Sequence, residues 1–325
     1  MNAMSSSPQV RTEDGSREFW WFGVLLLLLA ATLLMNSAIG PLGANMVRYP
    51  ISDSLANQLI GLEVVTVALV VPWCVLAGVR ALQGSPDGAV LAFGPAAYTC
   101  YMFVQYVLGP EYGEYRAVLL LHLALVTLSC GLTLWSWALL TRVELPARSR
   151  RVERVYGGVL LGLALFVIMR YAAAITGSFT GTEIPQEFGA ARTFYWTIYL
   201  LDLGVVVPGT VVAAVALLRG RDLGRRALFA VVGWFALVPP SVTAMAVIMF
   251  VNEDPHASMP TVVLLSIASL VFGVFAVVVY RPIFLASPSW RPDHRGDQVV
   301  EVSAFGPRRQ GVPAPHRREP RRSSG

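Results

Sequence analysis

The sequence has 325 residues, of which 55% are apolar and only 14% are charged, and its formal net charge is +5. Because soluble domains carry about one quarter charged residues, this composition excludes an ordinary soluble protein and indicates that a bilayer is the solvent. All 25 basic residues are arginine, so a cofactor held by lysine as a Schiff base is excluded as well.

Eight apolar stretches approach the roughly 20 residues that a helix needs to cross a bilayer. In chain order they lie near residues 19–40, 59–80, 89–108, 117–140, 156–177, 194–218, 227–251 and 260–280. We therefore predict an all-α fold, a polytopic transmembrane helical bundle of about eight spans. A cleaved signal sequence is the alternative for the first stretch, although such a signal usually has a shorter apolar run of about 7–15 residues.

The arginines predict the orientation of these helices. The connections 141–155 and 219–226 are rich in arginine, whereas alternate connections carry acidic residues such as Glu111, Glu183 and Glu253. Since short cytoplasmic loops retain positive charge, both termini are predicted to be cytoplasmic. The bias toward Arg, Ala, Val and Gly is typical of a bacterial genome rich in GC, so we expect a bacterial plasma membrane.

The chain divides into four predicted parts. Residues 1–18 form a cytoplasmic tail, 19–150 a first four-helix half, 151–281 a second half, and 282–325 a tail rich in arginine and proline. The second tail has too little apolar surface to offset its ordering entropy, so we expect disorder. It either contacts anionic lipid, at about 1 kcal/mol per arginine, or stays solvated. The arginines of the predicted cytoplasmic connections and tails account for the positive net charge, so we predict no nucleic-acid partner.

The two halves resemble each other around a proline. When Pro72 is placed over Pro208, VVP matches VVP, Gly84 matches Gly220 and Gly88 matches Gly224. This spacing predicts two four-helix repeats inserted in the same orientation. Chance similarity between valine-rich and leucine-rich helices is the alternative.

Polar side chains within the predicted spans gather about 5–12 Å from their outer ends, at a rise of about 1.5 Å per residue. They are Asn36, Glu63, Gln105, His122, Arg170 and Asp202. A charge near mid-bilayer costs at least about 2.5–3.5 kcal/mol, so we expect these groups to face one another or water. Either Arg170, Asp202 and Glu63 form an ion-pair clasp that fixes the helices, or the cluster lines an outward-facing polar cavity.

Prolines within the spans predict helix kinks that free backbone carbonyls. They are Pro72, Pro208, Pro239 and Pro240. The three cysteines all fall within spans, and His122 is the only histidine there, so we predict no disulfide, haem, metal or other cofactor. Motifs of serine hydrolases, zinc peptidases and P-loop enzymes are absent from the sequence.

Several segments together resemble an uncharacterised family of multi-pass bacterial membrane proteins. They read QLIGLEVVTVALVVP, RALQGSPDG, AYTCYMFVQYVLG and YLLDLGVVVPGTVVAAVALLRG, and the resemblance extends from about residue 20 to residue 280. It implies the multi-span architecture and the acidic positions Glu63 and Asp202 ahead of a VVxP-like segment. It implies no activity.

We therefore predict an integral membrane protein that binds or transports a small polar solute, ion or proton through the outward-facing cavity. A membrane-embedded enzyme acting on a lipid or isoprenoid is the second hypothesis, with Asp202 or Glu63 as general acid and aromatic side chains around the pocket. These are Tyr98, Tyr101, Trp196 and Tyr199. A structural or accessory role is the third hypothesis.

Overall fold

The computed structural model describes residues 13–110, 116–180, 188–189, 191–286 and 289–290. Within this part of the chain, eight helical stretches are long and apolar enough to cross a membrane, as the sequence predicts. They span Gly15–Ile39, Asp53–Leu82, Pro86–Leu108, Val118–Leu140, Arg150–Arg170, Arg192–Leu218, Asp222–Val251 and Met259–Leu285. The chain is an all-α polytopic membrane protein.

Five spans are single helices. They are α1 (Glu13–Ile39), α4 (Pro86–Leu108), α5 (Val118–Leu140), α6 (Arg150–Arg170) and α12 (Met259–Ala286). The short α7 (Ala172–Thr180) follows α6 directly.

Three spans consist of successive helical segments. The second is α2 (Asp53–Val65), the π-helical η1 (Thr66–Val70) and α3 (Val71–Leu82). The sixth is α8 (Arg192–Leu201), the π-helical η3 (Asp202–Val206) and α9 (Val207–Leu218). The seventh is α10 (Asp222–Phe235) and α11 (Val238–Val251).

Proline accounts for the place of these interruptions. Pro72 and Pro208 are the second residues of α3 and α9, immediately after the two π-helical segments. Proline has no N–H and its ring collides with the carbonyl four residues earlier, and a turn widened to the π-helical pattern accommodates both defects. The seventh span breaks at residues 236–237, just before Pro239 and Pro240.

The same backbone features recur 136 positions apart. The segments η1 and η3, and α3 and α9, have equal lengths and begin at Thr66 and Asp202, and at Val71 and Val207. The turns that follow place Gly84 and Gly220 at φ values of 67° and 69°, in the left-handed region that favours glycine. This correspondence supports the proposal that the halves are repeats.

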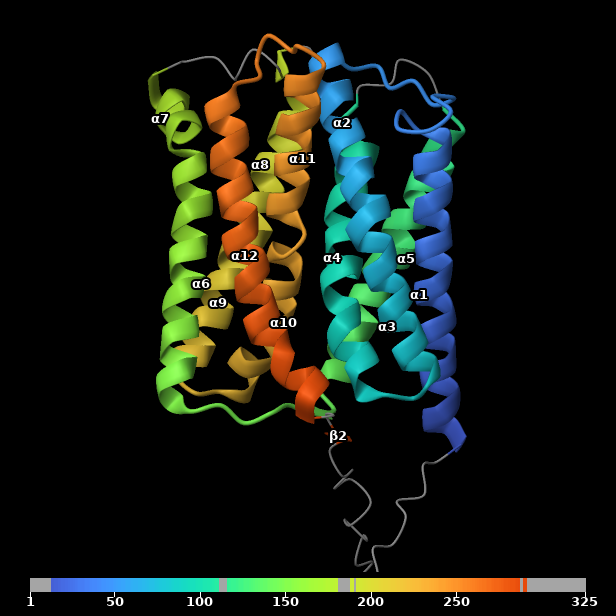
Figure 1. Cartoon of the computed structure of the whole chain (residues 1–325), viewed down its shortest axis with the longest axis vertical. Helices are drawn as coiled ribbons and strands as arrows, with labels where there is room; N and C mark the ends of the chain where they lie inside the picture. Colours follow the sequence, from blue (N-terminus) through green and yellow to red (C-terminus); the bar gives the residue numbers. More distant parts are fainter. Residues whose placement is uncertain (1–12, 111–115, 181–187, 190, 287–288, 291–325) are drawn as a thin grey trace, which may run out of the picture. The chain divides into compact units, whose positions relative to one another are not determined.

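Helix packing follows the division into halves. Figure 1 shows α1 to α5 gathered on one side of the bundle and α6 to α12 on the other. In the first half α3 packs between α1 and α4, and α5 packs on α4; in the second half α9 packs between α6 and α10, and α11 packs on α12. The halves meet where α2 contacts α11 and where α4 contacts α10 and α8.

One end of the bundle carries the arginine-rich connections and is called here the arginine-rich end. Glu153 is fully buried there and pairs with Arg150 and Arg225, each at 2.6 Å, so that it joins the fifth and seventh spans. The strands β1 (Val143–Glu144) and β2 (Ser289–Trp290) pair antiparallel. The chain after α12 is thereby tied to the connection between α5 and α6.

The expected start of the C-terminal tail at residue 282 needs a correction. Helix α12 contains Pro282 and continues to Ala286, because Ile283 is fully buried and packs in the apolar core beside Tyr280. These buried contacts offset the cost of the proline. The predicted disorder of residues 291–325 falls outside the described residues.

Candidate functional site

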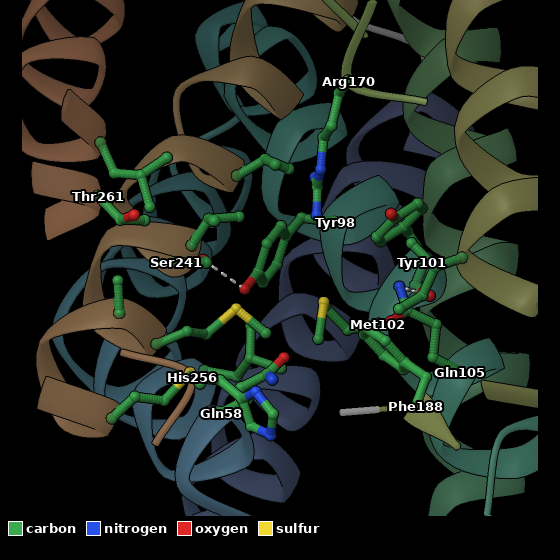
Figure 2. A pocket seen from close by; sticks show the side chains of 18 residues that line it. Gln58, Tyr98, Tyr101, Met102, Gln105, Arg170, Phe188, Ser241, His256 and Thr261 are labelled. Atoms are coloured by element: carbon green, nitrogen blue, oxygen red, sulfur yellow. Dashed lines mark hydrogen bonds between the residues drawn. The ribbon is translucent and has the colours of Figure 1, made fainter. Parts of the chain in front are cut away.

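A cavity of about 230 Å³ lies between residues of the two halves, and Figure 2 shows the side chains that line it. Its walls come from α2 and α4 of the first half and from α8, α11 and α12 of the second. Arg170, the last residue of α6, also lines it, as do Phe188 and His256. We call this cavity the inter-half pocket.

Close contact between α2 and α11 sets one wall of the pocket. Gly61 lies so near α11 that an added Cβ would be 2.4 Å from the backbone nitrogen of Met245. Only a residue without a side chain allows this approach. Gln58 and Leu62 flank Gly61 on α2 and face the pocket together with Met245.

Two hydroxyl groups in the pocket wall form a hydrogen-bonded chain that ends at a backbone carbonyl. The Ser241 hydroxyl lies 2.7 Å from the carbonyl oxygen of Leu237 and donates to it, and the Tyr98 hydroxyl lies 2.6 Å from Ser241 Oγ. Since the Ser241 proton is already used, Tyr98 donates its own proton to Ser241. Leu237 belongs to the break in the seventh span, so this chain connects α4 to the irregular backbone of the other half.

Asp202 lies behind the pocket wall. Its two carboxylate oxygens accept hydrogen bonds from Tyr101 and Tyr171, each at 2.6 Å, and the residue is 4% exposed. Both oxygens of this buried group are therefore hydrogen-bonded, as a buried polar group requires. Tyr101 itself lines the pocket and packs edge-on against Trp234. Tyr101 therefore joins the pocket to a buried carboxylate of the other half.

Arg170 is a member of the predicted cluster that lines the pocket (Figure 2). Its guanidinium lies 5.6 Å from the ring centre of Tyr171 and interacts electrostatically with both tyrosines that hold Asp202. Gln105 also lines the pocket. Arg170, Asp202 and Gln105 therefore lie in or next to one site.

Glu63 lies elsewhere, beneath the connection between α1 and α2. Its Oε2 accepts a hydrogen bond of 2.8 Å from the backbone N–H of Leu42, and the residue is 2% exposed. Its Oε1 lies close to Gly40 and has no hydrogen-bond partner in the described part of the chain. The carboxylate holds the connection against α2 and does not line the pocket.

His122 and Asn36 form a third group. His122 is fully buried, and its Nε2 lies 3.2 Å from Asn36 Oδ1 and 3.3 Å from the Tyr49 hydroxyl. The rings of Phe103 and Tyr106 pack against the imidazole. This aromatic cage joins α1, α4 and α5 within the first half, away from the pocket.

A polar network positions His256 at the pocket. Asp254 accepts hydrogen bonds from the backbone N–H of His256 at 2.9 Å and from the Asn57 side chain at 3.2 Å, and Asn252 donates to Asn57. Burial acts to raise the pKa of Asp254, but the hydrogen bonds outweigh it and hold the pKa below its usual value. The network ties the connection between α11 and α12 to the first turns of α2.

Sequence reasoning missed several pocket residues. Ser241 and the methionines Met102, Met245 and Met249 line the pocket, and Tyr171 holds Asp202. Serine and methionine are unremarkable within an apolar helix, so composition carries no signal for them. A weak signal exists for Tyr171, which directly follows the intramembrane arginine.

The lining of the pocket combines apolar and polar side chains. Apolar walls surround a guanidinium, two amides and an imidazole, a combination that suits a small ligand with one polar end. Among the residues that the structure describes, no three His, Cys, Asp or Glu side chains lie together as metal ligands.

No protein-family model, curated protein or solved structure matches this chain. The resemblance to an uncharacterised membrane family therefore stays a prediction.

Proposed function

We propose that this integral membrane protein takes up a small solute in the inter-half pocket and moves it across a bacterial plasma membrane. The observation that carries the proposal is that both halves contribute walls to one pocket. In transporters built of repeats, the substrate site lies at the repeat interface, and relative motion of the repeats exposes it to either side. Because arginine-rich loops are retained in the cytoplasm, we expect the arginine-rich end to be cytoplasmic and the pocket to lie toward the outer side of the membrane.

The helix interruptions supply the places where such motion is easiest. The segments η1 and η3 lie within the second and sixth spans, and the seventh span breaks at residues 236–237 beside the pocket. π-Helical turns and proline breaks are common sites of bending. The bonds from Tyr98 to Ser241 and from Tyr101 to Asp202 cross between the halves, and their rearrangement would accompany the motion.

Solute binding is favoured over enzymatic action on a lipid or isoprenoid. Neither Asp202 nor Glu63, the expected general acids, is among the described residues that line the pocket. Both oxygens of Asp202 accept hydrogen bonds from tyrosines, so the tyrosines occupy the positions from which Asp202 would contact a substrate. Among the aromatic residues expected around the site, Tyr98 and Tyr101 line the pocket, where their hydroxyl protons are committed.

A pocket-filling substitution tests the proposal. Ala246 lines the pocket, whereas the next residue, Val247, is 37% exposed on the lipid side of α11. We expect Ala246→Phe to abolish uptake of labelled small solutes into proteoliposomes, and Val247→Phe to leave uptake unchanged. The solutes form a panel of small carboxylates, amines and neutral molecules.

Two further variants address the polar residues. Arg170→Ala and Asp202→Asn should each reduce the uptake rate, because one removes the guanidinium in the pocket and the other weakens the support of Tyr101. Uptake of no solute above that of protein-free liposomes, or equal uptake by the Ala246→Phe and Val247→Phe variants, would refute the proposed function.

A further inference from the structure

We infer that the solute is a small organic anion, one carboxylate-like group on a compact apolar body. The inference rests on the proposed function, because it assigns the chemistry of the ligand in the same pocket. It draws on three features of the lining: its charge, the state of its hydroxyl groups, and its apolar surface.

The charge of the described lining favours an anion. Arg170 is the one side chain with a fixed charge among the described residues that line the pocket, and none of them is acidic. Beside these residues a cation would lose its hydration without gaining a counter-charge. Asp202 offers none, because Tyr101 separates it from the pocket and its oxygens already accept two hydrogen bonds.

The guanidinium of Arg170 can serve a ligand and the protein together. It has five N–H donors in a planar fork that matches a carboxylate in bidentate geometry. The guanidinium also lies 5.6 Å from the ring centre of Tyr171, a cation–π contact that helps to hold the side chain in position. The number of its donors therefore allows Arg170 to bind an anion and to keep its contacts with the protein.

The hydroxyl groups place the anionic group at the Arg170 end. Tyr98 donates to Ser241, Ser241 donates to Leu237, and Tyr101 donates to Asp202, so these hydroxyls offer only oxygen lone pairs to a ligand. A carboxylate beside them would meet repulsion. Figure 2 shows Arg170 at one end of the pocket, with the Tyr98–Ser241 bond between it and Gln58.

The other lining residues predict the size and polarity of the rest of the solute, apart from its anionic group. Leu62, Ile198 and three methionines form apolar walls, and thioether side chains adapt to varied apolar shapes. The volume of about 230 Å³ is below the roughly 300–1,000 Å³ of pockets for drug-sized ligands. A short alkyl or single-ring carboxylate matches both properties, whereas a two-chain lipid does not.

Three probes of matched size test the inference: hexanoate, hexanamide and hexylamine. Their binding to the purified full-length protein in detergent is measured by isothermal titration calorimetry. We expect hexanoate to bind at least about tenfold more tightly than the other two, a difference of about 1.4 kcal/mol. Benzoate, a single-ring carboxylate, should behave like hexanoate.

Variants identify Arg170 as the origin of this preference. Arg170→Gln should lower the affinity for hexanoate by at least about tenfold, and Arg170→Lys should restore part of it because the charge returns. Arg192→Gln is the matched control, since Arg192 is exposed on α8 and is not among the residues that line the pocket. It should leave the affinity unchanged.

The outcomes separate the inference from the proposed function. Equal or tighter binding of hexanamide or hexylamine, or binding of hexanoate that Arg170→Gln leaves unchanged, would overturn the anionic class. Uptake of another solute that Ala246→Phe abolishes would still support the function. If none of the four probes binds, the inference is overturned, and failure of Ala246→Phe to affect any uptake would overturn the function as well.

Discussion

Gly61→Ala tests whether the close contact of α2 with α11 defines the inter-half pocket. The alanine Cβ would lie 2.4 Å from the nitrogen and 2.5 Å from the Cα of Met245, and 2.7 Å from the carbonyl carbon of Ala244. All three atoms belong to the backbone, so no side chain can turn away to make room. The two helices must separate by about 1 Å to reach ordinary van der Waals distances.

The expected cost follows from two opposing effects. Overpacking a well-packed contact costs about 1–3 kcal/mol, while replacing glycine by alanine within a helix gains up to about 1 kcal/mol. We therefore expect a net decrease of about 1–2 kcal/mol in the free energy of unfolding. The separation also moves Gln58 and Leu62 away from α11, so ligand affinity should fall together with stability.

The assay is equilibrium unfolding of the purified protein in mixed micelles, with increasing denaturing detergent. Gly131→Ala is the matched control, because an added Cβ at this position on α5 has no neighbouring atom within 4 Å. It should be neutral or slightly stabilising. If Gly61→Ala is as stable as Gly131→Ala and binds ligand equally well, α2 and α11 do not meet at Gly61 as described.

Three further predictions concern side-chain contacts. Tyr171→Phe removes one of the two donors to Asp202 and should lower the free energy of unfolding by about 1–2 kcal/mol; a loss below about 0.3 kcal/mol would contradict this hydrogen bond. The thiols of Cys100 and Cys130 lie close enough to interact electrostatically, so mild oxidation with copper–phenanthroline should leave one of the three cysteines reactive to maleimide after denaturation, and three reactive thiols would exclude this proximity. Because the pKa of Asp254 is lowered, its carboxylate stabilises the fold above the ordinary pKa of about 4, and this contribution disappears as the pH falls through the lowered value. The difference in stability between the protein and Asp254→Asn should therefore shrink from about pH 6 to about pH 3, and a constant difference would refute this origin.

The spans and their interruptions could be predicted because both depend on local sequence. A helix in lipid must satisfy its own backbone groups, so a run of about 20 apolar residues is sufficient evidence for a span. Proline removes a donor wherever it occurs, and the breaks near Pro72, Pro208 and Pro239 lie beside these residues. Neither inference requires knowledge of neighbouring helices.

The polar cluster was harder to predict, because residue counting gives the depth of a side chain but not its direction around the bundle. Glu63 and Arg170 have similar expected depths, yet Glu63 is bonded to the connection after α1 and Arg170 lines the inter-half pocket. His122 likewise faces Asn36 and Tyr49 within the first half. Direction depends on which helices meet, and that is a property of the tertiary packing.

The two halves share a backbone pattern but differ in the chemistry it presents. Thr66 occupies the position in η1 that Asp202 occupies in η3, and its hydroxyl donates to the carbonyl of Leu62 in its own helix. Asp202 instead accepts hydrogen bonds from two tyrosines, one of them in the first half. The repeat alignment thus pairs Asp202 with a threonine that has no role between the halves.

This asymmetry bears on the number of solutes bound. At the same spacing of 136 residues, Arg170 and Tyr171 correspond to Leu34 and Met35, so the first half lacks the arginine and this tyrosine as well. Since the position equivalent to Asp202 is Thr66, the arrangement around Arg170 arises once in the described part of the chain. Calorimetry with hexanoate should therefore give one site per chain, and two equivalent sites would show that the pocket is not the place where the anion binds.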